Sequence, residues 1–238
     1  MKKIRKLLTL FAISLFVYSC INLGNSVTGN GNVTEEDRDV SGFDALEVEN
    51  GLDVFITMGE NESLRLEADE NLLPHIITEV DNGKLRIFSD VNIRMAKSKK
   101  IYVNYIQLND ISISSAGDVR SLNKLITNDL RLNLSSAGNL NLELEADEVE
   151  IEISSSGNAT LSGETEYLKA DLSSAGDLNA YNLEAKRGNV RVSSAGDARV
   201  NVTEEAEFNT SSAGDIVYMG DPKRINVNSS SAGEVRKR

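Results

Sequence analysis

Ser114-Ser115-Ala116-Gly117 is the first of seven closely similar tetrapeptides in the second half of the chain. Ser-Ser-Ala-Gly recurs at residues 135–138, 173–176, 193–196, 211–214 and 230–233, and Ser-Ser-Ser-Gly stands at 154–157. Their last residues are Gly117, Gly138, Gly157, Gly176, Gly196, Gly214 and Gly233, at steps of 21, 19, 19, 20, 18 and 19 residues. A repeat this short cannot bury an apolar face alone and has to stack on its neighbours, so the spacing predicts a solenoid.

The residues on both sides of each tetrapeptide alternate between apolar and polar. Leu130, Leu132 and Leu134 precede one tetrapeptide, and Leu140 and Leu142 follow it with the same parity. Each repeat therefore reads as an apolar strand, a corner, a second apolar strand and a variable turn. This pattern predicts an all-β fold, a single-stranded parallel β-helix with coils of about 20 residues. The preference of parallel crossovers predicts a right-handed winding.

The corner glycines and serines each have an expected structural role. A sharp corner needs either a positive φ or a close backbone approach, and glycine allows both. The second serine of each corner, such as Ser174, has the parity of the interior. We therefore expect a column of inward hydroxyls that bond along the stack or to backbone groups. The first serine, such as Ser173, is expected to point outward.

The N-terminus has the features of an export signal. Residues 1–6 carry four basic side chains, an apolar stretch follows to Tyr18, and the only cysteine of the chain is Cys20. This order predicts a lipoprotein signal peptide over residues 1–19 with Cys20 as the acylated mature N-terminus. Residues 20–39 are predicted to be a flexible tether, and 40–238 the β-helix domain, with regular coils from about residue 110. Within this domain, Glu70–Val80 could form a short helix, although Pro74 disfavours it.

The charge of the chain excludes one class of partner. The net charge is −12, and residues 1–19 hold four basic and no acidic residues. The remaining 21 basic and 37 acidic residues give −16, which is unsuited to nucleic acid or an anionic surface.

The sequence resembles the putative auto-transporter adhesin family with a head GIN domain, which is common in exported bacterial lipoproteins. Four stretches carry the resemblance: Phe43–Val48 with Gly51–Val54, Asp69–Leu73 with Asp81–Leu85, the repeated corners, and Ile216–Pro222 with the last glycine corner. The family often has Ser-Gly-Ser-Gly at its corners, whereas this chain has Ser-Ser-Ala-Gly. The resemblance implies a fold and an exported location, since the family has no motif with an assigned chemistry.

The sequence holds few candidates for catalysis or metal binding. One histidine, His75, and one cysteine cannot make a His/Cys metal set, and no base is placed to activate a serine. The residues that follow the corner glycines form one outward column: Asp118, Asn139, Asn158, Asp177, Asp197, Asp215 and Glu234. Asp177, Asp197 and Asp215 could bind a divalent cation. Alternatively, they are turn formers, the interpretation that we favour because Asn139 and Asn158 interrupt the charge.

The sequence therefore predicts a non-catalytic envelope lipoprotein without a cofactor, a binding or adhesive scaffold held in the outer membrane by its lipid. Its expected partners are that membrane and a polysaccharide or protein ligand. One alternative is a carbohydrate-active β-helix enzyme such as a lyase, for which Arg191 and Arg199 come closest to a basic patch. Another alternative is a regulatory or stress component of the envelope.

Overall fold

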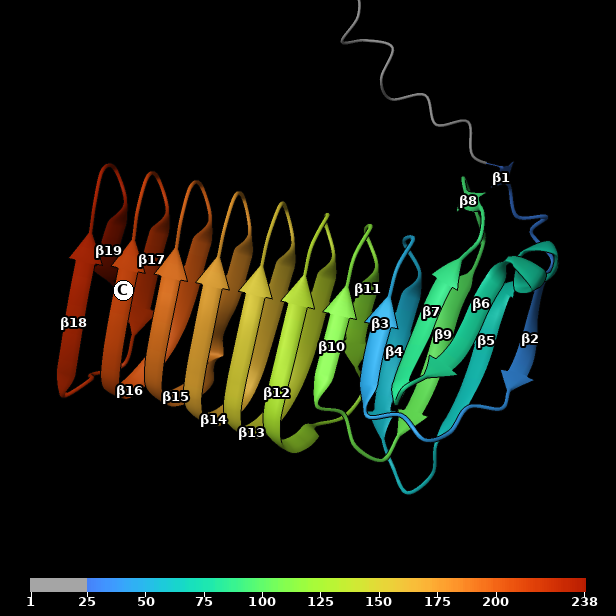
Figure 1. Ribbon diagram of the computed structural model, residues 1–238, viewed down its shortest axis with the longest axis horizontal. Helices are drawn as coiled ribbons and strands as arrows, with labels where there is room; N and C mark the ends of the chain where they lie inside the picture. The colour runs from blue at the N-terminus through green and yellow to red at the C-terminus, as the bar shows by residue number, and fades with distance from the viewer. Residues whose placement is uncertain (1–24) are drawn as a thin grey trace, which may run out of the picture.

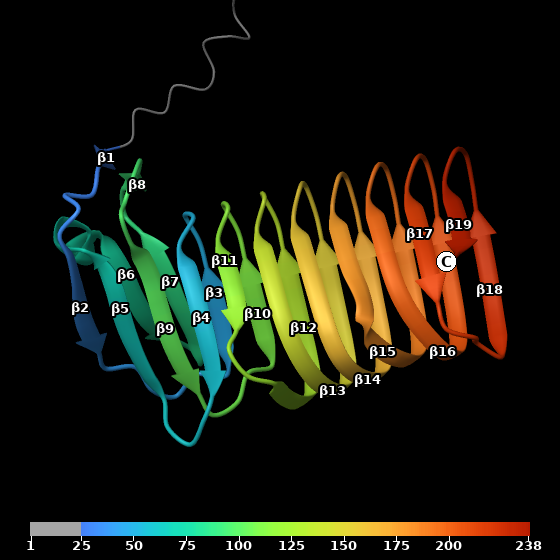
Figure 2. The same cartoon turned by 180° about the vertical axis from the view of Figure 1, so that it is seen from behind.

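The chain forms a β-solenoid in which parallel coils stack along one axis (Figures 1 and 2). The computed structural model describes residues 25–238. Cys20, the predicted signal peptide and the first part of the predicted tether lie outside these residues. The strands of the repeat region are β10 (Asp110–Ile113), β11 (Asp118–Ser121), β12 (Leu125–Leu134), β13 (Asn139–Ile153), β14 (Asn158–Leu172), β15 (Asp177–Val192), β16 (Asp197–Thr210), β17 (Asp215–Met219), β18 (Arg224–Ser229) and β19 (Glu234–Lys237).

Each coil contributes to two faces. A long strand such as β13 leaves one corner, runs away from it, bends at the opposite end of the coil and returns to the next corner. We call the surface made by segments that lead into the corners the entry face, seen in front in Figure 1. The segments that leave the corners make the exit face, seen in Figure 2. All corners lie along one edge of the solenoid, so equivalent residues of successive coils form straight columns.

The register keeps these columns aligned although the coils differ in length. Asp177 pairs with Asn158 in the preceding coil and with Asp197 in the next. The extra residues of the longer coil are taken up by register shifts at Thr160/Ser162, Ala180/Glu184 and Ala185/Arg187, away from the corners. The corner motif and its flanking strands therefore stack without offset.

The first coils are not stacked in chain order. β3 (Ala45–Val48) pairs in parallel with both β7 (Lys84–Ser89) and β10, and β4 (Asp53–Met58) pairs with both β9 (Lys99–Tyr105) and β11. The β3–β4 coil, which turns at Asn50-Gly51, is thus inserted between a later coil and the regular repeats. The alternation in this region is confirmed, since Leu46, Val48 and Val54 are buried.

Antiparallel strands cover the N-terminal end of the stack. β5 (Ser63–Asp69) pairs with β9, β2 (Val33–Arg38) pairs with β5, and β6 (Ile76–Asp81) pairs with β7. A short two-stranded sheet of β1 (Ser26–Val27) and β8 (Asn92–Ile93) lies beside them. The cap blocks further parallel pairing at this end, which would otherwise expose strand edges.

Two expectations fail in this cap. The predicted tether of residues 20–39 is wrong for its second half, because Val33–Arg38 is a paired strand and the Arg38 guanidinium donates to the carbonyls of Leu73 and Ile76. The possible helix at Glu70–Val80 is a 3₁₀ turn, η1 (Glu70–His75), followed by β6. Its Pro74 is consistent with a turn too short to continue as an α-helix.

The interior is filled by the predicted apolar columns, but the second corner serines do not join them. Their side chains are exposed and their φ angles lie between 49° and 66° in all seven corners. Alternation stops at the tip of a tight turn, so the parity argument fails there. The second serine takes the positive φ that was expected of glycine. At Ser115-Ala116 and Ser136-Ala137 both tip residues have positive φ, whereas in the other corners the serine alone does.

The corner glycine is needed for close approach instead. Gly176 lies inside, and a Cβ on it would be 2.7 Å from Ile153 Cγ2 and 3.2 Å from Ile153 O in the preceding coil. No corner glycine has a positive φ. Its hydrogen atom therefore makes room for the neighbouring coil.

Within residues 25–238, no helix is long and apolar enough to span a membrane.

Candidate functional site: a polar groove along the corners

A long groove of about 1100 Å³ runs along the entry face beside the corners. One wall is the first serine of every corner: Ser114, Ser135, Ser154, Ser173, Ser193, Ser211 and Ser230. The other wall is the outward column two residues earlier: Ser112, Asn133, Glu152, Asp171, Arg191, Asn209 and Asn228, with Glu47 at its N-terminal end. Because the coils are in register, both walls follow the axis of the solenoid.

Most of the serine hydroxyls along the groove are free to bind a ligand. The first serine points outward and is half-buried, as predicted for Ser173. Ser193 Oγ donates to Leu172 O at 3.3 Å, whereas the other six hydroxyls have no hydrogen-bond partner among the described residues. A hydroxyl can both donate and accept, so the groove carries a row of unoccupied hydrogen-bonding groups.

The floor of the groove is backbone rather than apolar side chain. The intervening residues, such as Leu134, Ile153 and Leu172, line it, but their side chains are at most 3% exposed and face the interior. Their strands pair on both edges with neighbouring coils. No aromatic residue of the described chain lines the groove, and its polar side chains lie on the two walls.

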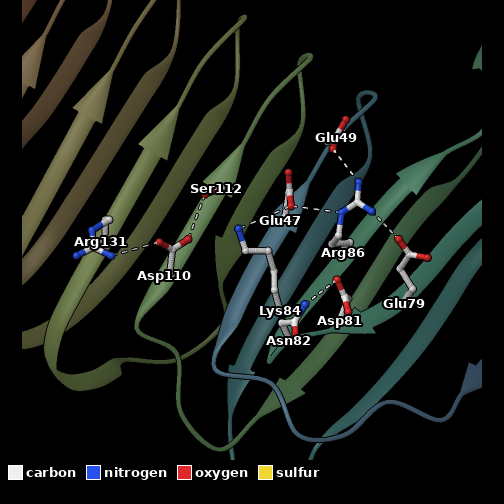
Figure 3. A network of polar contacts seen from close by, with 10 residues as sticks. All are labelled: Glu47, Glu49, Glu79, Asp81, Asn82, Lys84, Arg86, Asp110, Ser112 and Arg131. Carbon is white, nitrogen blue, oxygen red and sulfur yellow. Dashed lines mark hydrogen bonds and ion pairs between the residues drawn. The ribbon is translucent and has the colours of Figure 1, made fainter.

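Side chains of the second wall differ in whether they already have partners. At the N-terminal end, Glu47 lies 3.8 Å from Lys84 and 3.4 Å from Arg86 (Figure 3). Arg86 also contacts Glu49 and Glu79, so this end of the groove is held by a fixed network.

Further along the same wall, two more pairs form. Asp171 Oδ1 is 3.8 Å from Arg191 Nη1, and Asn228 Nδ2 donates to Asn209 Oδ1 at 3.0 Å. Between the two ends, the side chains of Asn133 and Glu152 have no hydrogen-bond or ion-pair partner among residues 25–238. These two neighbours in register are therefore the open part of the wall.

An alternating charge ladder stands next to the groove. Asp110, Arg131, Glu150 and Lys169 occupy one column in consecutive coils, with N–O distances of 3.9, 3.7 and 2.5 Å. Asp110 also accepts a hydrogen bond from Ser112, which lines the groove (Figure 3). The hydrogen bond from Lys169 lowers the pKa of Glu150, although burial opposes it. These charges are neutralised by each other and support the wall rather than offering free charge.

The predicted acidic column lies on the exit face, away from the groove. Asp177, Asp197 and Asp215 are in register in consecutive coils, as the sequence predicted. Asp197 lies 3.7 Å from Arg199, and Asn158 Nδ2 donates to Asn139 Oδ1 at 3.2 Å. Nowhere in the described chain do three or more His, Cys, Asp or Glu side chains gather as a metal site would require. Turn formation remains the interpretation of this column that we favour over cation binding.

The remaining candidates do not form a common site. Arg191 and Arg199 lie on opposite sides of one corner, the first on the entry face and the second on the exit face. These two guanidinium groups therefore do not form a basic patch on one face. His75 sits at the surface of the cap, where Nδ1 is 2.9 Å from Asp90 Oδ1.

The sequence analysis missed the residues that form the groove. The candidate residues predicted from the sequence follow each glycine, but the residues that precede each corner show the same pattern of polar, outward side chains. The residues five and three positions before each corner glycine, such as Asp171 and Ser173 before Gly176, are polar and point outward. Seven such pairs at a fixed step would have predicted two parallel polar rows on one face.

Comparison with known proteins agrees with this architecture. The family model described as "Putative auto-transporter adhesin, head GIN domain" matches residues 42–222. A putative adhesin from Bacteroides fragilis NCTC 9343 superposes with a TM-score of 0.84 at 21% identity, covering 89% of this chain and 100% of that one. A search of curated proteins found no match.

Two further solved structures share the fold. A putative adhesin from Parabacteroides merdae ATCC 43184 has a TM-score of 0.72 at 20% identity, covering 90% of this chain and 99% of its own. A putative lipid binding protein from Parabacteroides distasonis ATCC 8503 has a TM-score of 0.74 at 20% identity, covering 90% and 100%. At these identities the likeness concerns the fold, whereas the family model covers most of the sequence. The chain belongs to the putative auto-transporter adhesin family with a head GIN domain.

Proposed function

We propose that this protein is a non-catalytic adhesive scaffold of the cell envelope that holds an extended polymer in the groove beside its corners. The observation that carries the proposal is the row of seven first serines along a straight groove, because six of their hydroxyls have no hydrogen-bond partner among residues 25–238. A linear polymer can contact successive coils in the same way, and weak contacts then add along its length.

The location follows from two separate arguments. Membership of an adhesin-like family favours an exported protein that acts at the cell surface. The order of residues around Cys20 favours an acyl anchor, which would tie the solenoid to the outer membrane by its N-terminal side. Because the cap lies at that side of the chain, the repeat region would extend away from the anchor (Figure 1).

A binding role also fits the chemistry of the groove better than catalysis. Acid–base catalysis needs titratable groups with shifted pKa values that converge on one reacting atom. Here Asp171 is paired with Arg191, and no histidine or lysine is among the described residues that line the groove. The wall repeats similar contacts along the axis and concentrates no reactive centre.

The test is to fill the groove and measure binding. The full chain, purified in detergent, is screened against immobilised polysaccharides and extracellular-matrix proteins. The double variant Ser154→Tyr/Ser173→Tyr places two bulky side chains in the groove. The matched control, Thr160→Tyr/Asn179→Tyr, puts the same side chains at exposed positions of the exit face.

We expect the wild type and the control to bind at least one polymer and the groove variant to lose that binding. Circular dichroism melts of all three proteins establish that they are folded. Undiminished binding by a folded groove variant, or no binding of any polymer by the wild type, would contradict the proposal.

A further inference from the structure

We infer that the groove selects an uncharged, hydroxyl-rich glycan and that Asn133, Glu152 and their adjacent corner serines form its central recognition subsite. This inference rests on the proposed function and specifies its ligand. The candidate ligands to be distinguished are lipids, extended polypeptides, anionic polymers and neutral glycans.

The floor of the groove disfavours acyl chains and peptides. An acyl chain needs apolar side chains to cover it, yet the apolar residues under the central part of the groove, such as Ile153, face the interior and are at most 3% exposed. Among the apolar residues that line the groove, only Val227 at its C-terminal end is exposed. An extended peptide would add to a free strand edge, but the strands under the central part of the groove are paired on both sides, and only β18 at the C-terminal end is paired on one side. Neither ligand finds its usual contacts in this part of the surface.

The charges disfavour a polyanion. The groove is lined by the carboxylates of Glu47, Glu152 and Asp171 and by one guanidinium, that of Arg191. Glu47 and Asp171 have cationic partners, but the carboxylate of Glu152 has none among the described residues. An uncompensated carboxylate in the middle of the site repels sulfated or uronic polymers, and the net charge of −12 adds to this repulsion.

The remaining groups match sugar hydroxyls. Glu152 accepts hydrogen bonds, Asn133 both donates and accepts, and the hydroxyls of Ser135 and Ser154 do both. Asn133 and Glu152 are paired in register in neighbouring coils, about 4.8 Å apart, which is close to the advance of one sugar unit in an extended chain. A neutral sugar would satisfy polar groups that have no other protein partner.

The experiment compares neutral and anionic polymers on the full chain in detergent. Dextran, mannan, xyloglucan and arabinogalactan are the neutral probes, and polygalacturonate, hyaluronate and heparin are the anionic ones. Binding is measured by affinity electrophoresis for the wild type and for Asn133→Ala, Glu152→Ala and Glu152→Gln. Asn141→Ala and Glu143→Ala are the controls, because they remove the same side-chain types from exposed positions on the exit-face part of β13.

We expect at least one neutral polymer to bind and no anionic one. Asn133→Ala and Glu152→Ala should each weaken that binding about threefold to tenfold, the usual effect of one hydrogen bond. Glu152→Gln should retain most of the affinity because the amide oxygen still accepts. The two control variants should bind as the wild type does.

The contrary results separate the two proposals. Preferential binding of an anionic polymer would overturn the ligand class. Unchanged neutral-glycan binding by folded Asn133→Ala and Glu152→Ala proteins would overturn the assignment of the subsite. In both cases a polymer-binding groove still stands. Binding of matrix proteins but of no polysaccharide would also overturn the ligand class. Failure of every polymer to bind would overturn the proposed function itself.

Discussion

Substitutions at two corner residues, Gly176 and Ser174, test how the coils stack. Gly176 faces the interior, where a Cβ would lie 2.7 Å from Ile153 Cγ2. Ser174, two residues earlier, is exposed with a φ of 61°. Gly176→Ala therefore adds a methyl group where the preceding coil already stands, and Ser174→Gly removes a side chain from a backbone conformation that glycine adopts more easily.

The two substitutions should change stability in opposite directions. Overpacking costs about 1–3 kcal/mol, and the lower entropy of the unfolded alanine chain offsets about 0.4–1 kcal/mol of this. Gly176→Ala should therefore destabilise by about 1–2 kcal/mol. For Ser174→Gly, relief of the left-handed backbone, about 1–2 kcal/mol, exceeds the added glycine entropy of about 0.5–1 kcal/mol. The result should be neutral to slightly stabilising.

Thermal and urea unfolding followed by far-UV circular dichroism measure both effects. For a chain of this size, 1 kcal/mol corresponds to about 2–4 °C in Tm, so Gly176→Ala should melt several degrees below the wild type. Ser173→Ala is the control, because its outward hydroxyl has no hydrogen-bond partner among the described residues. A Ser174→Gly protein that is less stable than Gly176→Ala would refute the assignment of close approach to the glycine and positive φ to the serine.

Four further predictions concern other parts of the chain. Asp69 is 1% exposed. Burial raises the pKa of its carboxyl, but hydrogen bonds from the N–H groups of Gly31, Ser98 and Lys97 outweigh burial and lower this pKa below 3.8. Asp69→Ala should cost about 1–3 kcal/mol and expose residues 25–32 to proteolysis, and the stability that the wild-type carboxylate contributes should be lost as the pH falls below 3.8. Glu150→Gln should cost about 0.5–1 kcal/mol at neutral pH. This difference from the wild type should shrink as the pH falls below 4.5 and through the lowered pKa of the Glu150 carboxylate. Melts in millimolar Ca²⁺ and in NaCl of equal ionic strength should coincide, whereas a Ca²⁺-specific rise lost in Asp197→Asn would make the acidic column a metal site. Mass spectrometry of membrane-extracted protein should find Cys20 acylated at the mature N-terminus, and an unmodified cysteine would contradict the anchor.

Periodicity predicted the repeat region well because burial of alternating residues is a property of each strand. Leu132, Leu140 and Ile151 are buried as expected. The same argument placed Ser174 inside, because it continued the alternation through the two tip residues of a turn. Only the backbone angles show that the serine leaves the pattern and that Gly176 resumes it.

The order of the first coils could not be read from the sequence. β3 has the alternation of any inner strand, and alternation does not say which strand becomes its neighbour. Its insertion between β7 and β10 depends on pairings across 39 and 65 residues of chain. The groove is a second such property, since it arises only when outward residues of separate coils are aligned.

The most direct test of the account is a crystal structure of the full chain with an oligosaccharide of the neutral polysaccharide that binds best. If the groove binds a neutral glycan, density for an extended chain will lie on the entry face, parallel to the solenoid axis. The chain will form hydrogen bonds to Asn133, Glu152 and the first corner serines of at least two consecutive coils. Density confined to the exit face or to the antiparallel cap would contradict the assignment of the groove as the binding site.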